Sequence, residues 1–190
     1  MKTKVDEVDR NIYDFKNKDD YEFKMKKGLN KEIVEEISRQ KNDPDWMIKI
    51  RLDALAMYDK LELPTWGPDL SELRMDDIAT YVKPKSKLNS SWDDVPENIK
   101  NTFDKLGIPD AEKKSLGGVG AQYDSEVVYH SMKEDLLKQG VIYTDMETAV
   151  KEYPEIVKEY FMKCVPISEH KFVALHAAVW SGGSFVYVPK

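Results

Sequence analysis

The chain has 190 residues and a formal net charge of −6, with 29 Lys and Arg against 35 Asp and Glu. An acidic surface repels phosphates, which argues against a nucleic-acid-binding protein, and no run of about 18 apolar residues predicts a membrane span. The N-terminus lacks the apolar stretch of a secretory signal. The single cysteine, Cys164, permits no internal disulfide, so we expect a cytoplasmic protein.

Residues 1–27 contain eight Lys and Arg and seven Asp and Glu in alternating sign. Such a segment offers little apolar surface to offset the entropy lost on ordering. We expect a flexible charged leader that docks through its few aromatic side chains.

After this segment, apolar residues recur at the spacing of a helix. Asn30 predicts the start of a helix that ends near Asn42, because an Asn side chain can accept a hydrogen bond from the first turn. Pro44 begins a second amphipathic helix, which ends at Leu63-Pro64. The Pro- and Gly-containing residues 64–68 form an extended connector.

The middle of the chain predicts mainly helices joined by short connections. The expected elements are a short strand at 78–82, a helix opened by Pro96, a short helix at 109–117, a helix at 125–139, a strand at 141–143, a helix with a Thr144–Glu147 capping box, and a helix opened by Pro154.

The last part of the chain, from Ser168 onward, is more apolar and ends in a β-prone run. Ser168 predicts the start of an apolar helix, residues 181–183 predict a turn, and residues 184–188 are strongly β-prone. We expect this strand to lack a partner within the chain. An unpaired strand exposes a row of backbone hydrogen-bonding groups, so we expect the chain to be cut short.

The candidate metal ligands are Cys164, His130, His170 and His176. A protein-held iron–sulfur cluster usually takes four ligands, mostly thiolates, and a structural zinc site takes four at close spacing. One cysteine and three scattered histidines match neither pattern. We interpret the histidines, including His130 in the expected helix, as structural or exposed, and Cys164 as a small buried residue.

Two other motifs have structural explanations. Residues 117–120 are glycine-rich but follow an expected helix and lack the Lys-Ser/Thr of a phosphate loop, so we interpret them as a tight interhelical turn. Asp93 and Asp94 stand at a helix start, where capping accounts for them. For Trp66, Trp92 and Trp180 we favour anchoring of loops onto a core over partner binding.

Several ordered segments resemble the SufB family, the scaffold subunits of the SUF iron–sulfur cluster assembly system. They are NIYDFK at 11–16, KGLN at 27–30, DWM at 45–47, PTWG at 64–67, SWDDVP at 91–96, LGIP at 106–109, GVGAQYDSEVVYH at 118–130, AVWSGGSF at 178–185 and YVPK at 187–190.

The resemblance implies an N-terminal helical region followed by a long right-handed parallel β-helix. It also implies partners, namely SufD, the SufC ATPase and a cysteine desulfurase or sulfur carrier, and an association of the full-length family with an iron–sulfur cluster and reduced flavin. The family's cluster-binding and sulfur-accepting residues lie beyond the matched segments, so it implies no site residue here.

We therefore predict an α+β fold that is predominantly helical and ends in the first element of a truncated β-helix. The predicted domains are a leader at 1–27, a helical N-terminal domain at 28–165 and the start of the β-helix domain at 166–190. The predicted function is a structural and interaction role within an iron–sulfur cluster scaffold. We predict no enzymatic activity and no catalytic, cofactor-binding or metal-binding residue.

Two alternatives stay open at this point. One is a stand-alone helical interaction module without cluster chemistry. The other is a nucleotide-binding protein that uses the glycines at 117–120.

Overall fold

The computed structural model describes residues 20–106 and 116–190. Its helices are α1 (Lys31–Lys41), α2 (Asp45–Lys60), α3 (Glu97–Lys105), α5 (Glu134–Lys138), α6 (Met146–Glu152), α7 (Pro154–Tyr160) and α8 (Lys171–Val179), with short 3₁₀ helices η2 (Met75–Asp77) and η3 (Trp92–Asp94). Its strands are β1 (Tyr21–Lys24), β2 (Val82–Pro84), β3 (Gly118–Tyr123), β4 (Glu126–Met132), β5 (Ile142–Asp145) and β6 (Ser184–Tyr187).

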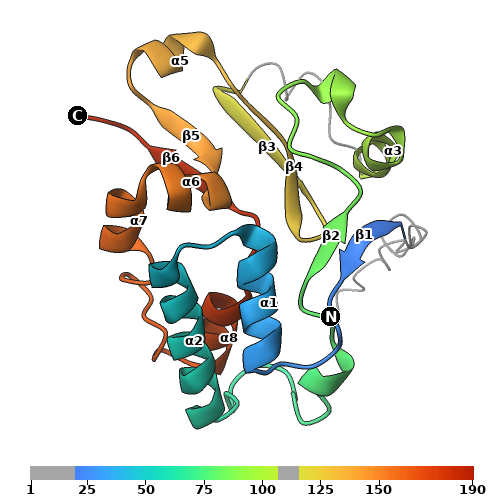
Figure 1. The fold of residues 1–190 in the computed structure, drawn as a ribbon, viewed down its shortest axis with the longest axis vertical. Helices are drawn as coiled ribbons and strands as arrows, with labels where there is room; N and C mark the ends of the chain where they lie inside the picture. The colour runs from blue at the N-terminus through green and yellow to red at the C-terminus, as the bar shows by residue number, and fades with distance from the viewer. Residues whose placement is uncertain (1–19, 107–115) are drawn as a thin grey trace, which may run out of the picture.

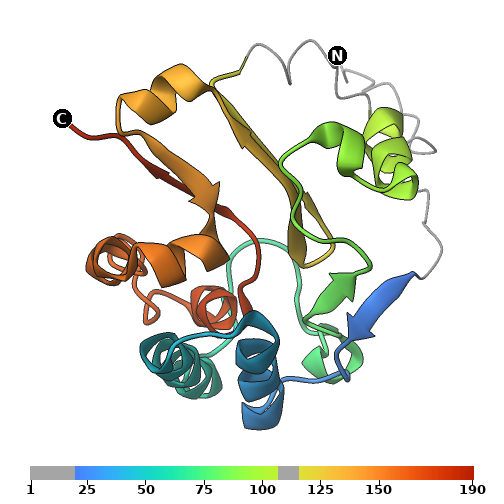
Figure 2. The same cartoon turned by 45° about the horizontal axis from the view of Figure 1, so that its top comes forward.

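Helices α1, α2 and α8 gather at one end of the molecule, and the β3–β4 hairpin lies toward the other (Figures 1 and 2). In the described part of the chain, the named strands pair antiparallel in three two-stranded sheets: β1 with β2, β3 with β4, and β5 with β6. The predicted fold class, with the first element of a parallel β-helix at its C-terminal end, is wrong, because these strands form no parallel sheet.

Strand β6 differs most clearly from the prediction of a β-helix. This strand forms where its β-prone sequence predicts it, but Ser184 pairs with Asp145 and Tyr187 with Ile142. The strand therefore finds its backbone partner in β5, about forty residues earlier in the chain. The expectation that this strand lacks a partner within the chain is therefore wrong.

The predicted helix at 125–139 is also wrong. Residues 126–132 form β4, and only Glu134–Lys138 are helical. Asp124 takes a left-handed conformation (φ 52°) in the two-residue turn between the paired residues Tyr123 and Glu126. This turn, together with the β-branched and aromatic run that follows it, favours a hairpin over a helix.

Other predicted elements hold with adjusted bounds. The Asn30 side chain caps α1 by accepting from the amide of Ile33, and Asn42 ends that helix in a left-handed conformation. The expected strand at 78–82 forms later, as β2. In the expected leader, residues 21–24 form β1, and residues 1–19 lie outside the described part. Residues 109–115 of the expected helix at 109–117 lie outside it too.

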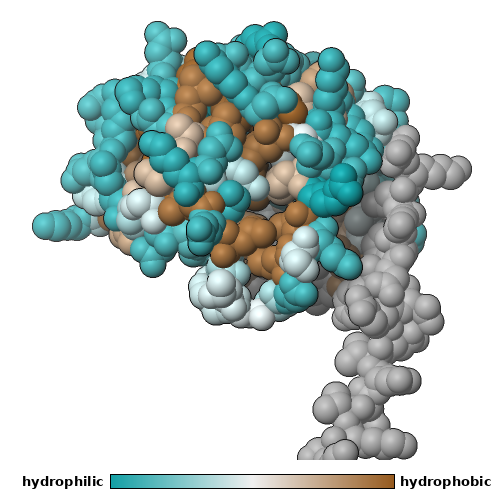
Figure 3. Space-filling view, turned by 90° about the horizontal axis from the view of Figure 1, so that it is seen from below, coloured by the Kyte–Doolittle hydropathy of each residue, from teal (hydrophilic) through white to brown (hydrophobic). Residues whose placement is uncertain are grey.

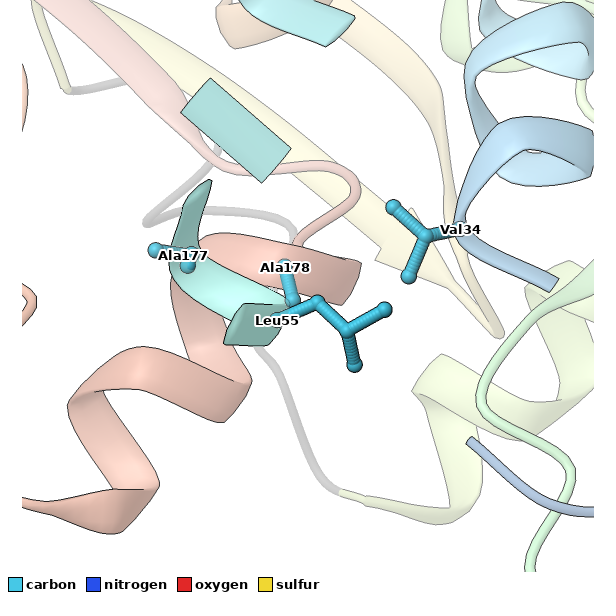
Figure 4. Close-up of a cluster of buried hydrophobic side chains, with 5 residues drawn as sticks. Val34, Leu55, Ala177 and Ala178 are labelled. Carbon is cyan, nitrogen blue, oxygen red and sulfur yellow. The ribbon is translucent and has the colours of Figure 1, made fainter. Parts of the chain in front are cut away.

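The core is divided into several clusters. The first joins α1, α2 and α8 through Val34, Ala54, Leu55, Ala177 and Ala178 (Figure 4). The small alanines let α2 and α8 approach closely, and these two helices share the most extensive contact among the helix pairs of the described residues.

Three further clusters attach the remaining elements. One packs α6 and α7 against α2, one packs α3 against the hairpin, and one packs Tyr81 against β1 and α1. Burial of each apolar face stabilises the element that carries it by about 25 cal/mol per Å².

Candidate functional site

A buried lysine joins three separate elements. Lys41 is the last residue of α1, and its side chain is 2% exposed. Its Nζ lies 2.9 Å from Oε1 of Glu126 in β4, 2.7 Å from Oε1 of Glu147 in α6, and 3.2 Å from the carbonyl oxygen of Ser125. One amine therefore links α1 to both the hairpin and α6.

Both carboxylates accept a second donor. The Tyr81 hydroxyl donates to Oε1 of Glu126 at 2.5 Å, and the Gly182 amide donates to Oε1 of Glu147 at 2.6 Å. Burial first, and then the hydrogen bond to Glu126, raise the pKa of Tyr81, so this phenol stays a donor. We call Lys41, Tyr81, Glu126, Glu147 and Gly182 the Lys41 network.

A second buried cation, Arg51 of α2, pairs with Asp43 and also binds backbone carbonyls at the end of α8. Nε of Arg51 donates to Oδ2 of Asp43 at 2.7 Å, and the two side chains are 0% and 1% exposed. Nη1 donates to the Trp180 carbonyl oxygen at 2.9 Å and to that of Ala178 at 3.3 Å. Burial lowers the pKa of Arg51, and Asp43 opposes that shift.

The Trp180 ring completes this arrangement. The Arg51 guanidinium lies 4.5 Å from the ring centroid, and Trp180 is 6% exposed. A cation over an indole face in a desolvated position adds to the ion pair. Arg51 thus fixes the point where the chain leaves α8 and turns toward β6.

A cavity of about 340 Å³ borders the Lys41 network, with Glu126, Glu147, Asp145, Lys83 and Glu22 among its lining residues. These groups already have partners. Glu126 and Glu147 accept from Lys41, Asp145 caps α6 by accepting from the amide of Thr148 at 2.8 Å, and Lys83 pairs with Glu22 at 2.9 Å. The cavity wall therefore positions elements of the fold rather than presenting spare ligands.

Asp145 also corrects an expected cap. The predicted Thr144–Glu147 capping box does not form, because the cap residue is Asp145 and Glu147 is used by Lys41 and Gly182. The Glu147 carboxylate therefore binds Lys41 and the Gly182 amide instead of a backbone amide at the start of its own helix.

The glycines at 117–120 are not an interhelical turn. Gly118 and Gly120 lie in β3, where a Cβ on Gly118 would collide with the Tyr143 ring and one on Gly120 would lie 3.0 Å from the Tyr143 hydroxyl. A Cβ on Gly117 would lie 2.8 Å from a methyl carbon of Leu136. Close packing against these side chains explains the glycines without a phosphate.

The four candidate metal ligands are dispersed. His130 lies in β4 rather than in a helix, 4.7 Å from Tyr143 between ring centroids. Nδ1 of His170 caps α8 by accepting from the amide of Phe172, whereas His176 and Cys164 are exposed. The prediction of a buried Cys164 is therefore wrong. Over residues 20–106 and 116–190, no three His, Cys, Asp or Glu side chains are arranged to hold a metal ion.

The environment of His130 shifts its titration. Burial lowers the pKa of His130, and the nearby charge of Asp145 opposes the shift. The neutral imidazole is therefore the favoured form in the folded protein.

The tryptophans divide into two groups. Trp92 packs edge-on against Phe103 and Tyr129, at 5.5 and 5.3 Å between ring centroids, and Trp180 is buried, so both anchor the core. Trp66 does not, since it is 67% exposed. Beside Trp92, Asp93 lies in η3, where its amide donates to Oγ of Ser91.

No role was predicted from the sequence for Lys41 or Arg51, although the positions of both residues indicate that their charges are buried. Arg51 lies four residues after Met47 and three before Ala54, within the apolar stripe of α2, and Lys41 lies four residues after Ile37. A charge at such a position is buried and needs a partner. The partners of Lys41 lie 85 and 106 residues away, too far along the chain for spacing to identify them. Asp43 lies only eight residues before Arg51, within the range of such reasoning.

Comparison with known proteins places the chain in a family. The family described as SufBD protein N-terminal region matches residues 29–190. The chain belongs to the SufBD family. The resemblance to SufB that the sequence motifs predicted is thereby confirmed.

The SufBD relatives are similar over the whole chain. It is 52% identical over 190 residues to the iron–sulfur cluster assembly protein SufB of Bacillus subtilis, and to iron–sulfur cluster assembly SufBD family proteins of Staphylococcus haemolyticus and Staphylococcus aureus. The chain spans 41% of the length of each of these relatives. In the part of this SufBD N-terminal region that the structure describes, no helix is both long and apolar enough to cross a membrane.

Proposed function

We propose that this chain serves as the N-terminal part of an iron–sulfur cluster assembly scaffold, and that its own role is structural and interaction-based rather than enzymatic. The observation that carries the proposal is the 52% identity to SufB across all 190 residues. The buried ion pairs support a structural role, because they hold distant segments in a fixed arrangement.

In this proposal the cluster is a cargo that the whole protein assembles in the cytoplasm together with SUF partners. Those partners are SufD, the SufC ATPase and a cysteine desulfurase or sulfur carrier, and the flavin association of the family belongs to the whole protein as well. We assign no cluster ligand to this chain. The division into segments 1–27, 28–165 and 166–190 remains a prediction.

A chimera tests the proposal. The corresponding N-terminal region of Bacillus subtilis SufB is replaced by this chain, and cells that depend on the chimera are assayed for growth and for an iron–sulfur enzyme activity. We expect the chimera to support both. A matched chimera carrying Lys49→Met, a surface substitution, controls for the general effect of altering the chain.

Failure would be informative. A chimera that accumulates as a folded protein and yet supports neither growth nor the enzyme would show that this chain does not serve the scaffold's N-terminal function.

One observation favours the alternative of a stand-alone interaction module. β6 pairs within the chain, and α8 packs on α2, so these two elements find partners without further polypeptide. A stand-alone module predicts that the 190-residue chain unfolds cooperatively and that its fusion to the rest of SufB gives no cluster assembly. The scaffold proposal predicts that the fusion is active.

A further inference from the structure

An apolar groove opens at the end of the molecule where α2 finishes. It has a volume of about 300 Å³, and Tyr58, Leu63, Leu73 and Met75 contribute its apolar lining. Leu63 and Leu73 are each 37% exposed. Figure 3 looks at this end of the molecule and shows apolar surface interrupted by hydrophilic side chains. Exposed apolar surface next to polar residues is typical of binding sites.

Trp66 contacts the residue that precedes Lys171 of the groove lining. Its ring meets that of His170 edge-on, at 5.7 Å between centroids, and the next residue, Lys171, lines the groove. The Trp66 side chain is therefore oriented by one contact while 67% of its surface stays exposed. Tryptophans are enriched among the residues that dominate binding energy at protein interfaces.

The segment at residues 59–77 contributes most of the groove lining and is acidic, and we call its carboxylates the acidic rim. Between residues 59 and 77 the sequence has six carboxylates, all exposed, against the two cations Lys60 and Arg74. The acidic residues are Asp59, Glu62, Asp69, Glu72, Asp76 and Asp77. This segment therefore carries a net −4 of the chain's −6.

Two cations, Arg74 and Lys171, line the groove together with Asp76, and both cations have partners within the chain. Nζ of Lys171 donates to the carbonyl oxygens of Tyr58 and Leu61, each at 2.8 Å, and so satisfies the C-terminal end of α2. Nε of Arg74 lies 3.5 Å from Asp77. Burial first, and then the charges of Asp59 and Asp76, raise the pKa of Tyr58, in keeping with a negative potential in the groove.

We propose that this groove binds a basic amphipathic segment of a partner protein, with the segment's apolar side chains in the groove and its Lys and Arg side chains against the acidic rim. The inference deepens the proposed interaction role and rests on it. It specifies the binding surface and the chemistry of the partner, and electrostatic complementarity of this kind supplies orientation and rate of association.

The same charges disfavour two other occupants. A symmetric dimer formed through this face would place one acidic rim against another, which is repulsive. An anionic membrane surface would repel the rim as well.

Binding to a defined peptide tests the proposal. The probe is a fluorescent helical peptide of about four turns, built from Leu and Lys so that one face is apolar, and its match has Glu in place of Lys. Anisotropy is measured with the full 190-residue chain at low and high salt. We expect the Leu/Lys peptide to bind, its affinity to fall with salt, and the Leu/Glu peptide not to bind.

Matched variants locate the binding. Glu62→Lys with Glu72→Lys is expected to weaken binding about tenfold, since each reversal removes one attraction and adds one repulsion. Trp66→Ala is expected to weaken it by at least about tenfold. Asp104→Lys with Glu152→Lys changes the net charge equally at exposed sites in α3 and α6, and should change the affinity by no more than about twofold.

Four outcomes would overturn the proposal. The Leu/Lys peptide does not bind, or both peptides bind equally well, or the control reversals weaken binding as much as the rim reversals do, or the chain self-associates through this face and Trp66→Ala abolishes that association. Circular dichroism of each variant confirms folding. The chimera can still succeed when the peptide fails, so a failure here is distinguishable from failure of the scaffold proposal.

Discussion

Replacing Lys41 with methionine keeps most of the side-chain volume and removes the amine of the Lys41 network. The substitution leaves Glu126 and Glu147 without their shared cation. Removing one partner of a fully buried ion pair costs about 3–5 kcal/mol. These carboxylate side chains keep 22% and 13% exposure, and each retains a second donor, so we expect the free energy of unfolding to fall by about 2–3 kcal/mol.

Urea unfolding of the 190-residue chain, followed by circular dichroism, measures this change. The expected loss corresponds to a midpoint lowered by about 1 M urea. Lys49→Met is the control, because Lys49 is 74% exposed and its pair with Asp53 should contribute less than about 0.5 kcal/mol.

Adding Glu147→Gln to Lys41→Met should restore part of the stability, because an amide keeps the acceptor for the Gly182 amide and removes an uncompensated charge. The reasoning is refuted if Lys41→Met costs no more than Lys49→Met, or if Glu147→Gln further destabilises the Lys41→Met chain.

Three further substitutions follow from the structure. Arg51→Met leaves Asp43 buried without its cation and should cost about 3–5 kcal/mol in urea unfolding; a loss below about 1 kcal/mol would contradict the buried pair. Gly118→Ala should cost about 1–2 kcal/mol through its clash with Tyr143, and the same substitution should cost less in a Tyr143→Ala chain, which lacks the clashing ring atoms. The lowered pKa of His130 means that the unfolded chain takes up the proton first as pH falls below the ordinary value of 6.5. Stability is therefore lost below that pH, and His130→Gln should lose less between pH 7 and about 5; identical pH profiles for the two chains would exclude this role.

Local signals in the sequence predicted local structure well. Asn30 caps α1 as expected, Asn42 ends it, and Pro154 opens α7. Each of these depends on a residue type whose preference is satisfied within one turn of helix. The long amphipathic stripe of α2 is likewise decided by its own spacing.

The failures concern segments whose structure depends on distant partners. The spacing of apolar residues in 125–139 fits a helix, but Val128 and Tyr129 pack in a hairpin against Ala121 and α3. The β-prone run at 184–187 revealed a strand without revealing its partner β5. Whether a segment is stable as a strand depends on the neighbours it packs against, and tertiary structure determines those neighbours.

The candidate site follows the same rule. The sequence marks Lys41 and Arg51 as charged residues on apolar helix faces. The carboxylates that Lys41 binds lie 85 and 106 residues away from it. The carbonyl groups that Arg51 binds at the end of α8 lie 127 and 129 residues away from it. Family membership, by contrast, was accessible from short motifs in a fixed order along the chain, which do not depend on tertiary contacts.

The packing of α2 against α8 has a consequence for how the polypeptide is made. The contact between Arg51 and Ala178 spans 127 residues, so at about 5–20 residues per second a ribosome needs roughly 6–25 s to supply α8 after it has supplied α2. During that interval the nascent chain carries Ala54, Leu55 and the Arg51 side chain without their final neighbours. The burial of the early helices α1 and α2 therefore depends on the late synthesis of α8.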